Sequence, residues 1–242
     1  MNIRERLKPN VSFAFLLLGL LVGQSCADDS KPDLLTLSTI NKVATTEGGQ
    51  KYYFTQDDGQ TMHPGKGEEW LTDSGYDDGQ RAFVLFNTLD VPADGYDYNI
   101  EVKQITPVLT QKVITLGEDG NTEETVGDDK INATYLWISK DRKYLTVEFQ
   151  YYSTGNEEKK HLLNLAINPS AAKDKTDAGE GSFIELEFRH NSQGDSPSTL
   201  SEGYVSFKLD PLRGQMEGRK GIRVRVNTLY EGVKQYDVNF SD

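Results

Sequence analysis

From residue 34 onwards, short apolar runs alternate with acidic, glycine-bearing turns, a pattern compatible with few folds other than packed β-sheets. The runs are rich in tyrosine, phenylalanine and β-branched residues, which favour strands. The turn Asp57-Asp58-Gly59 is typical of a hairpin, because glycine accepts the positive φ that such a turn needs. The run 144–152 alternates apolar and polar residues, which indicates a strand with one buried face. The chain is therefore expected to be all-β.

The runs between residues 34 and 117 predict one small barrel. The nearly continuous apolar run 81–86 indicates a strand buried on both faces, whereas 96–105 alternates and indicates a strand with one buried face. The run 108–116 supplies the last apolar positions of this group. About five strands in so short a segment favour a closed or partly closed barrel, because closure protects the strand edges.

Residues 118–130 are polar and acidic with almost no core residue, so they predict a linker between two domains. Beyond it, residues 131–242 contain about seven short runs with turn signals between them, which predicts an antiparallel β-sandwich. Two long polar segments, 168–181 and 191–203, interrupt these runs, and loops of that length are often functional.

The N-terminus has the layout of a bacterial lipoprotein signal. Three basic residues come first: Arg4, Arg6 and Lys8. The apolar run 11–22 that follows is shorter than a membrane-spanning helix, as in a secretory signal peptide. It ends just before Cys26, the only cysteine of the chain. The sequence predicts a signal peptide over residues 1–25, lipidation of Cys26, and a polar tether over 26–33.

The alternative is an ordinary secreted protein with a free thiol at Cys26, which would be a liability in an oxidising compartment. Lipidation is therefore favoured. The pair Asp28 and Asp29 resembles the acidic export signal of Bacteroidota surface lipoproteins. We expect an outer-membrane lipoprotein that faces outwards, with a periplasm-facing protein as the alternative.

Charge and cysteine content exclude some classes of protein. Loss of the signal peptide removes three basic residues and one acidic residue, so the net charge changes from −12 to −14. Such a chain repels phosphate backbones, and nucleic-acid binding is not expected. With no second cysteine there is no intramolecular disulfide, so each domain depends on its hydrophobic core.

Several segments, in this order and spacing, resemble the NigD-like lipoproteins of Bacteroidota. The segments are Asp57-Asp58-Gly59-Gln60, Asp78-Gly79-Gln80-Arg81, 105–112, 143–147, 161–165, Leu186-Glu187-Phe188-Arg189-His190-Asn191 and 205–209. The resemblance implies an N-terminal OB-like five-stranded barrel and a C-terminal immunoglobulin-like β-sandwich behind a lipoprotein signal. It implies no particular biochemical activity, although the family takes its name from a bacteriocin-associated gene cluster.

The sequence offers no enzymatic motif: there is no nucleophile elbow, glycine-rich phosphate loop or cysteine nucleophile in the folded part. The acidic turns could hold calcium, but none follows the twelve-residue calcium loop, and turn chemistry explains them. Zinc bound by His161 and His190 would lack further ligands. We expect a non-enzymatic protein with no cofactor and no metal site.

Two places are candidates for binding. Arg189, His190 and Asn191, with His161 and Asp195, form the sharpest polar cluster if strand alternation points Arg189 outwards and His190 inwards. In one interpretation, Arg189 grips a carboxylate or sugar that His190 orients. In the other, which we favour, His190 is hydrogen-bonded inside the sandwich and braces the following loop.

The second candidate is Trp70, which lies in the polar stretch 66–78. An exposed tryptophan there would be a platform for a sugar ring, whereas a buried one would plug the barrel end. The resulting expectation is a non-catalytic outer-membrane lipoprotein that binds a protein or a glycan. The alternatives are a bacteriocin immunity lipoprotein, whose acidic surface suits a cationic toxin, and a structural accessory of an envelope complex.

Overall fold

The computed structural model of the chain describes residues 31–45, 49–72, 75–156, 159–172, 182–196 and 198–240, with only the backbone of Trp70 and Ala172. The described chain is built mostly of strands, which form one closed barrel and two further sheets. The prediction of an all-β chain with a barrel and a β-sandwich is confirmed. Within the described residues, no helix has the length and apolar character needed to cross a membrane.

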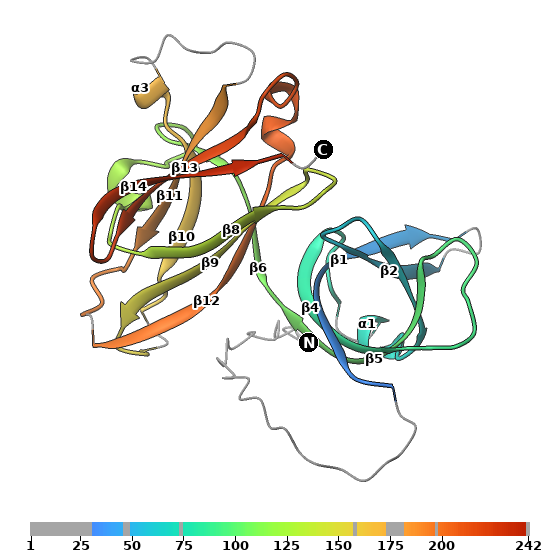
Figure 1. Cartoon of the computed structure of the whole chain (residues 1–242). Helices are drawn as coiled ribbons and strands as arrows, with labels where there is room; N and C mark the ends of the chain where they lie inside the picture. The colour runs from blue at the N-terminus through green and yellow to red at the C-terminus, as the bar shows by residue number, and fades with distance from the viewer. Residues whose placement is uncertain are drawn as a thin grey trace, which may run out of the picture. The chain divides into compact units, whose positions relative to one another are not determined.

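The barrel closes in the order β1-β2-β3-β5-β4 (Figure 1). Its strands are β1 (Leu34–Ala44), β2 (Gln50–Gln56), β3 (Thr61–Lys66), β4 (Gln80–Thr88) and β5 (Tyr98–Pro107). All neighbours are antiparallel except β3 and β5. The predicted hairpin lies between β2 and β3, with Gly59 at a φ of 90°. The short helix α1 (Glu69–Thr72) follows β3 and places Leu71 fully buried in the barrel core.

The run 81–86 forms most of β4 and was expected to be buried on both faces. One face is fully buried, whereas the other is buried only in part. Ala82, Val84 and Phe86 are buried in the barrel core, whereas Phe83 is half-buried on the other side. There the Phe83 ring meets Tyr204 of the sandwich at 5.0 Å between centroids. The apolar character of the outer face of β4 therefore reflects contact with the second domain.

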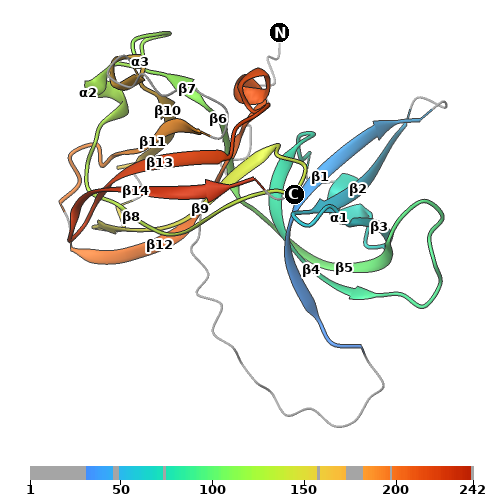
Figure 2. The ribbon, with the colours of Figure 1, turned by 45° about the horizontal axis from the view of Figure 1, so that its top comes forward.

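The sandwich consists of two sheets, in the orders β14-β13-β11-β10-β7 and β6-β12-β9-β8 (Figure 2). The first sheet contains β7 (Ile114–Thr115), β10 (Leu162–Ile167), β11 (Phe183–Asn191), β13 (Gly221–Thr228) and β14 (Gly232–Asn239). The second contains β6 (Leu109–Lys112), β8 (Asn132–Ile138), β9 (Tyr144–Ser153) and β12 (Thr199–Lys208). Three short helical segments accompany them: α2 (Glu123–Val126), α3 (Pro169–Ala172) and the 3₁₀ segment η1 (Asp210–Gln215).

The sandwich is mixed rather than wholly antiparallel, which corrects the prediction. The pairs β6–β12, β7–β10 and β11–β13 are parallel. The physical reason is the path of the chain: β12 belongs to the opposite sheet, so β11 and β13 become neighbours through a crossover.

The run 108–116 was assigned to the barrel by sequence, and the structure corrects this. Its strands β6 and β7 pair with β12 and β10 of the sandwich. Val113 is buried in the sandwich core and Leu109 packs against it. The fifth barrel strand is instead β3, in which Pro64 and Gly65 obscure the strand pattern.

The segment 118–130, predicted to be a linker, packs on the sandwich instead. It contains α2, whose Val126 is buried with Leu116 and Ala166 in a small separate core. Asp128 in the same segment receives two hydrogen bonds of 2.8 Å from Arg225 on β13. The acidic residues that suggested a solvated linker are partly used as partners for basic residues on the sheet.

Candidate functional site

Four of the predicted site residues have no described side chain. Cys26, Asp28 and Asp29 lie outside the described residues, so the predicted anchor and export signal stay predictions. Trp70 lies in α1, but its side chain is also outside the description. The two interpretations of Trp70, a platform for a sugar ring and a plug of the barrel end, both stay predictions.

Arg189 lies on the face of β11 opposite Phe188, as strand alternation predicts. It is nevertheless only 5% exposed. Its Nε donates to Glu187 Oε2 at 2.6 Å, and one terminal nitrogen donates to Glu123 Oε2 at 2.8 Å and to the Gly127 carbonyl at 3.2 Å. The contacts with Glu123 and Gly127 join the α2 segment to the sheet, and binding of a ligand by Arg189 stays a prediction.

His190 is 2% exposed and forms a chain of hydrogen bonds with His161 and Asp195. His161 Nδ1 lies 2.7 Å from His190 Nε2, and His161 Nε2 lies 3.2 Å from Asp195 Oδ2. At the other end, His190 Nδ1 lies 3.2 Å from the carbonyl of Lys130. The ring of Tyr151 stacks on His161, with 4.4 Å between centroids.

Both ends of this chain are acceptors: the Asp195 carboxylate and the Lys130 carbonyl. Three hydrogen bonds between two acceptors need three N–H groups, and two neutral imidazoles carry only two. The pair His161–His190 therefore satisfies every hydrogen bond only when it holds one additional proton.

Burial and neighbouring groups shift the pKa values of two members of this cluster. Burial and the neighbouring His161 lower the pKa of His190 to about 4, so His190 is neutral at pH 7. Hydrogen bonds from Thr154 and His161 hold the pKa of Asp195 well below its usual range. Asp195 Oδ1 accepts from the Thr154 hydroxyl at 2.7 Å. The cluster thus fixes the loop after β11, in line with the structural interpretation of His190.

Asn191 has the same kind of role. Its Nδ2 donates to the carbonyls of Glu124 and Thr125 at 3.1 and 3.0 Å, and its Oδ1 accepts from the backbone of Gln193 at 2.9 Å. Among the described residues, no group of three or more His, Cys, Asp or Glu side chains is arranged to hold a metal ion.

The joint between the barrel and the sandwich contains a polar chain that sequence reasoning missed. Arg81 on β4 is fully buried and donates to Asp57 Oδ1 at 2.5 Å and to Thr39 Oγ1 at 2.9 Å. Asp57 Oδ2 accepts from the indole Nε1 of Trp137 at 2.7 Å. The guanidinium also lies 4.8 Å from the ring centroid of Tyr144. One buried cation therefore links two barrel strands, a hairpin and β9, and reaches β8 through Asp57.

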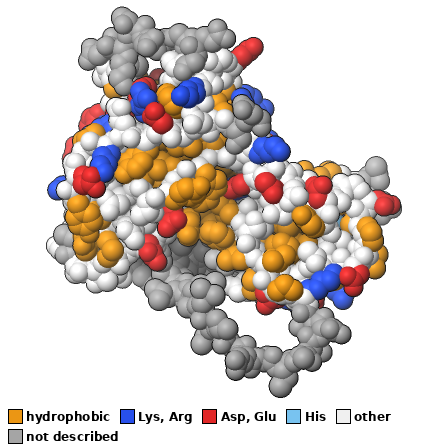
Figure 3. Space-filling view, viewed as in Figure 1, with side chains coloured by type: hydrophobic (Ala, Val, Ile, Leu, Met, Phe, Trp, Pro, Cys, Tyr) orange, Lys and Arg blue, Asp and Glu red, His pale blue; other side chains and the backbone are white. Residues whose placement is uncertain are grey.

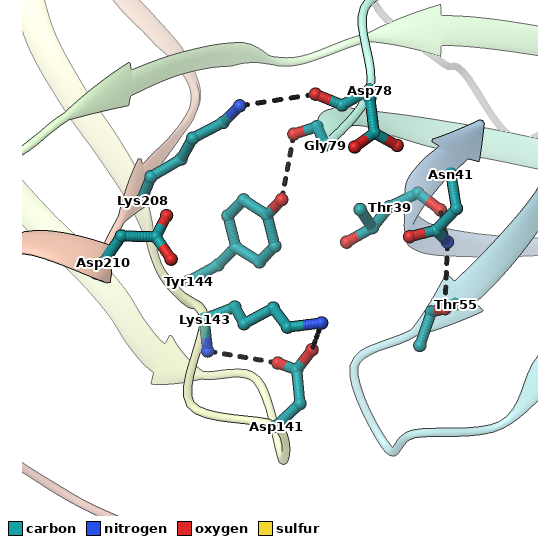
Figure 4. A pocket seen from close by; sticks show the side chains of 10 residues that line it. All are labelled: Thr39, Asn41, Thr55, Asp78, Gly79, Asp141, Lys143, Tyr144, Lys208 and Asp210. Carbon is teal, nitrogen blue, oxygen red and sulfur yellow. Dashed lines mark hydrogen bonds and ion pairs between the residues drawn. The ribbon is translucent and has the colours of Figure 1, made fainter. Parts of the chain in front are cut away.

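A polar pocket of about 230 Å³ lies next to this joint (Figure 4). Its lining residues are Thr39, Asn41, Thr55, Asp78, Gly79, Asp141, Lys143, Tyr144, Lys208 and Asp210. The Tyr144 hydroxyl donates to the Gly79 carbonyl at 3.0 Å, and burial raises the pKa of this phenol to about 12. Lys143 pairs with Asp141 at 3.1 Å. The contacts of Tyr144 with Gly79 and of Lys208 with Asp78 join the two domains. The pairs Asp141–Lys143 and Asn41–Thr55 each lie within one domain.

Four aromatic rings follow one another on the surface, from β8 over β12 to β4. We call these residues, Tyr135, Trp137, Tyr204 and Phe83, the aromatic strip. Centroid distances are 5.3 Å for Tyr135–Trp137, 6.4 Å for Trp137–Tyr204 and 5.0 Å for Phe83–Tyr204. Tyr135 is 61% exposed and Tyr204 is 37% exposed. Figure 3 shows hydrophobic side chains gathered on the sandwich, with acidic side chains beside them.

Two rings of the aromatic strip flank a carboxylate. Glu148 on β9 is the cross-strand partner of both Tyr135 and Tyr204, so it lies between them on the same face. Burial, together with the charges of Glu148 and Glu202, raises the pKa of Tyr204. Sequence reasoning did not single out this surface. The signal was present, since Tyr135 and Trp137 are two residues apart on one strand and therefore share a face.

A closed barrel followed by a β-sandwich defines the class, a two-domain all-β protein. The sequence matches the NigD-like N-terminal OB domain over residues 40–108 and the NigD-like C-terminal beta sandwich domain over residues 112–240. The chain belongs to the NigD-like family, as the resemblance predicted. No curated protein matches the chain in sequence.

Solved structures of several bacterial proteins share the fold. A protein of unknown function from Bacteroides vulgatus ATCC 8482 has 24% identity and a TM-score of 0.66, covering 87% of this chain and 92% of that one. A protein from Parabacteroides distasonis ATCC 8503, named for a relation to a toxin, has 25% identity and a TM-score of 0.64, covering 87% and 94%. A NigD-like immunity protein from Bacteroides caccae ATCC 43185 has 16% identity and a TM-score of 0.54, covering 84% and 92%.

Proposed function

We propose that the chain is a non-catalytic, lipid-anchored protein of the outer membrane that faces outwards and binds a protein or a glycan through the aromatic strip. The observation that carries the binding part is the exposure of Tyr135 and Tyr204 on a rigid sheet beside Trp137. Aromatic side chains already fixed on strands lose little conformational entropy when they bind a partner. Their exposure on a folded surface is typical of a contact site.

The lipid anchor rests on the sequence. A signal-peptide layout ends at Cys26, the only cysteine, and the acidic pair Asp28 and Asp29 follows it. Burial of an acyl chain contributes about 0.8 kcal/mol per methylene, so several chains on one cysteine make the attachment effectively permanent.

The location is tested by protease shaving of intact cells that carry either the native chain or Cys26→Ala, with a periplasmic protein as the integrity control. We expect the native chain to be cleaved while the periplasmic protein survives, and the variant to leave the membrane fraction. A native chain that stays in the membrane fraction but resists cleavage would place it on the periplasmic side.

The binding part is tested by chemical crosslinking of intact cells, followed by purification of the native chain, Tyr135→Ala and Val91→Ala. Val91 is 71% exposed on the barrel and serves as the matched control. We expect Tyr135→Ala to lose the crosslinked species that the other two retain. Equal recovery from all three chains would contradict binding through the aromatic strip.

A second candidate function is protection against an antibacterial protein. It is favoured by the fold shared with a NigD-like immunity protein, although that likeness is at 16% identity. The net charge of −12 suits a cationic attacker, because opposite charges speed encounter. Deletion of the gene should then raise bacteriocin sensitivity, and complementation should restore resistance. Unchanged sensitivity would count against this function.

A further inference from the structure

We infer that the aromatic strip, with the carboxylates of Glu148 and Glu202, binds a basic polypeptide segment whose arginine or lysine side chains lie over the tyrosine rings. This inference rests on the proposed function, since it assigns a partner class to the same surface. Three features of the described residues carry it: the orientation of the rings, the placement of the carboxylates, and the rigidity of the support.

The rings do not form a flat platform. Trp137 and Tyr204 are turned by 72° to each other, as are Phe83 and Tyr204, and Tyr135 is tilted by 32° to Trp137. A sugar chain stacks best on ring faces that lie in one plane, which this interlocked edge-to-face packing does not offer. Separate ring faces at different angles suit individual side chains, and a guanidinium is attracted to such a face within about 6 Å of its centroid.

The carboxylates are placed to complement a basic side chain. Glu148 lies between the two exposed tyrosines on the central strand, and Glu202 is exposed on the same face of β12 as Tyr204. Glu202 Oε2 accepts only a long hydrogen bond of 3.4 Å from Gln150 among the contacts of the described residues. A cation bound here would meet both a ring face and a carboxylate.

Basic residues of the same sheet lie elsewhere. Lys208 and Lys112 are opposite each other at the end of β12 and β6, and Lys208 lines the polar pocket. The part of the sheet face around Glu148 and Glu202 is therefore acidic, within a chain whose net charge is −12. This field favours basic partners and disfavours acidic ones.

The support of the site is preorganised. The indole N–H of Trp137 is held by Asp57, and Asp57 is in turn fixed by the fully buried Arg81. The rings next to Trp137 therefore rest on a fixed neighbour before any partner arrives, which reduces the entropy cost of binding.

The test uses the protein with residues 1–25 removed and three probes: a peptide of alternating arginine and serine, the same peptide with glutamate for arginine, and maltohexaose. Binding is measured by calorimetry for the native protein, for Glu148→Gln with Glu202→Gln, and for Asp94→Asn with Glu118→Gln. The second pair is a matched control, because Asp94 and Glu118 are exposed acids away from the aromatic strip and both variants change the net charge equally.

We expect only the arginine peptide to bind, with an affinity that falls as salt rises. The Glu148 and Glu202 variant should weaken binding about tenfold, and the matched control less than about twofold. Equal weakening by both double variants would overturn the inference, because it would reflect net charge alone.

Other outcomes separate this inference from the proposed function. Binding of maltohexaose but not of the arginine peptide, lost on Tyr135→Ala, would overturn the basic partner yet leave the aromatic strip as a binding surface. Binding of no probe would overturn the basic partner, while the location and crosslinking experiments would still decide the proposed function. Unchanged thermal unfolding of each variant confirms that the fold is intact.

Discussion

Asp57, in a barrel hairpin, accepts a hydrogen bond of 2.7 Å from the indole of Trp137, which lies 80 residues further along the chain in the sandwich. The other oxygen of Asp57 is bound by the buried Arg81 at 2.5 Å. One carboxylate therefore both balances a buried cation and orients a ring of the aromatic strip. Through this residue, the joint between the domains and the candidate binding surface depend on each other.

Removal of the Asp57 carboxylate should therefore be costly. In Asp57→Ala, Arg81 keeps its buried charge without a counter-ion, which should lower the free energy of unfolding by about 3 kcal/mol. Urea denaturation measures this change. Asp58→Ala is the control from the same turn, since Asp58 is exposed and only accepts a hydrogen bond from the Gln60 backbone. Similar losses in the two variants would contradict the role given to Asp57.

The Arg189 network predicts a second contrast. Arg189→Gln leaves the buried Glu187 without its cation and should lower the free energy of unfolding by about 3 kcal/mol. Glu123→Gln removes the partner whose side chain is 67% exposed, and should cost less than about 1 kcal/mol. Thermal unfolding of both variants checks the order. A stable Arg189→Gln protein that has lost a binding activity would instead support the ligand-binding interpretation.

His190 predicts a pH dependence. Burial lowers the pKa of His190 to about 4 in the folded protein, whereas an ordinary histidine, as in the unfolded chain, has a pKa of 6.5. Between these values the unfolded chain binds a proton that the folded chain does not, so stability falls as the pH is lowered through this window. The loss should approach about 3 kcal/mol near pH 4.

This loss is measured by urea denaturation between pH 7 and pH 4, with His190→Gln compared with the native chain. The slope of stability against pH should shrink in the variant. An identical slope in the two chains would show that His190 does not control the dependence.

Two glycines in one segment predict different costs. Both Gly127 and Gly117 have positive φ, at 75° and 87°, so alanine strains the backbone at either position. A Cβ at Gly127 would also lie 2.6 Å from the carbonyl of His190, whereas a Cβ at Gly117 meets nothing within 4 Å. Gly127→Ala should therefore lower the melting temperature clearly more than Gly117→Ala. Equal shifts of the melting temperature would contradict the close packing of Gly127 against the backbone of β11.

Turn chemistry and alternation were sufficient to predict the all-β fold. The strand at β9 and the hairpin at Gly59 depend on neighbouring residues only, and both are confirmed. The expected single buried face of β9 is wrong at its start, where residues 144–147 are all buried. The strand β3 was missed because Pro64 and Gly65 are poor strand formers, and their place depends on pairing with β5. The pairing of β6 and β7 with the sandwich is likewise a long-range property that no local pattern contains.

The candidate site was predictable only in part. The inward side chain of His190 followed from the period of the strand, and its contacts with His161 and Asp195 agree with the structural interpretation. The aromatic strip required the register that brings Tyr204 and Tyr135 to either side of Glu148, and sequence does not give register.

The most direct test of binding through the aromatic strip is site-specific photo-crosslinking in intact cells. A photoreactive phenylalanine derivative, which keeps an aromatic ring, is placed at Tyr135 or, as the control, at Val91, which are 61% and 71% exposed. We predict a discrete crosslinked product from position 135 and none above background from position 91. No product from position 135, or the same products from both positions, would contradict the account.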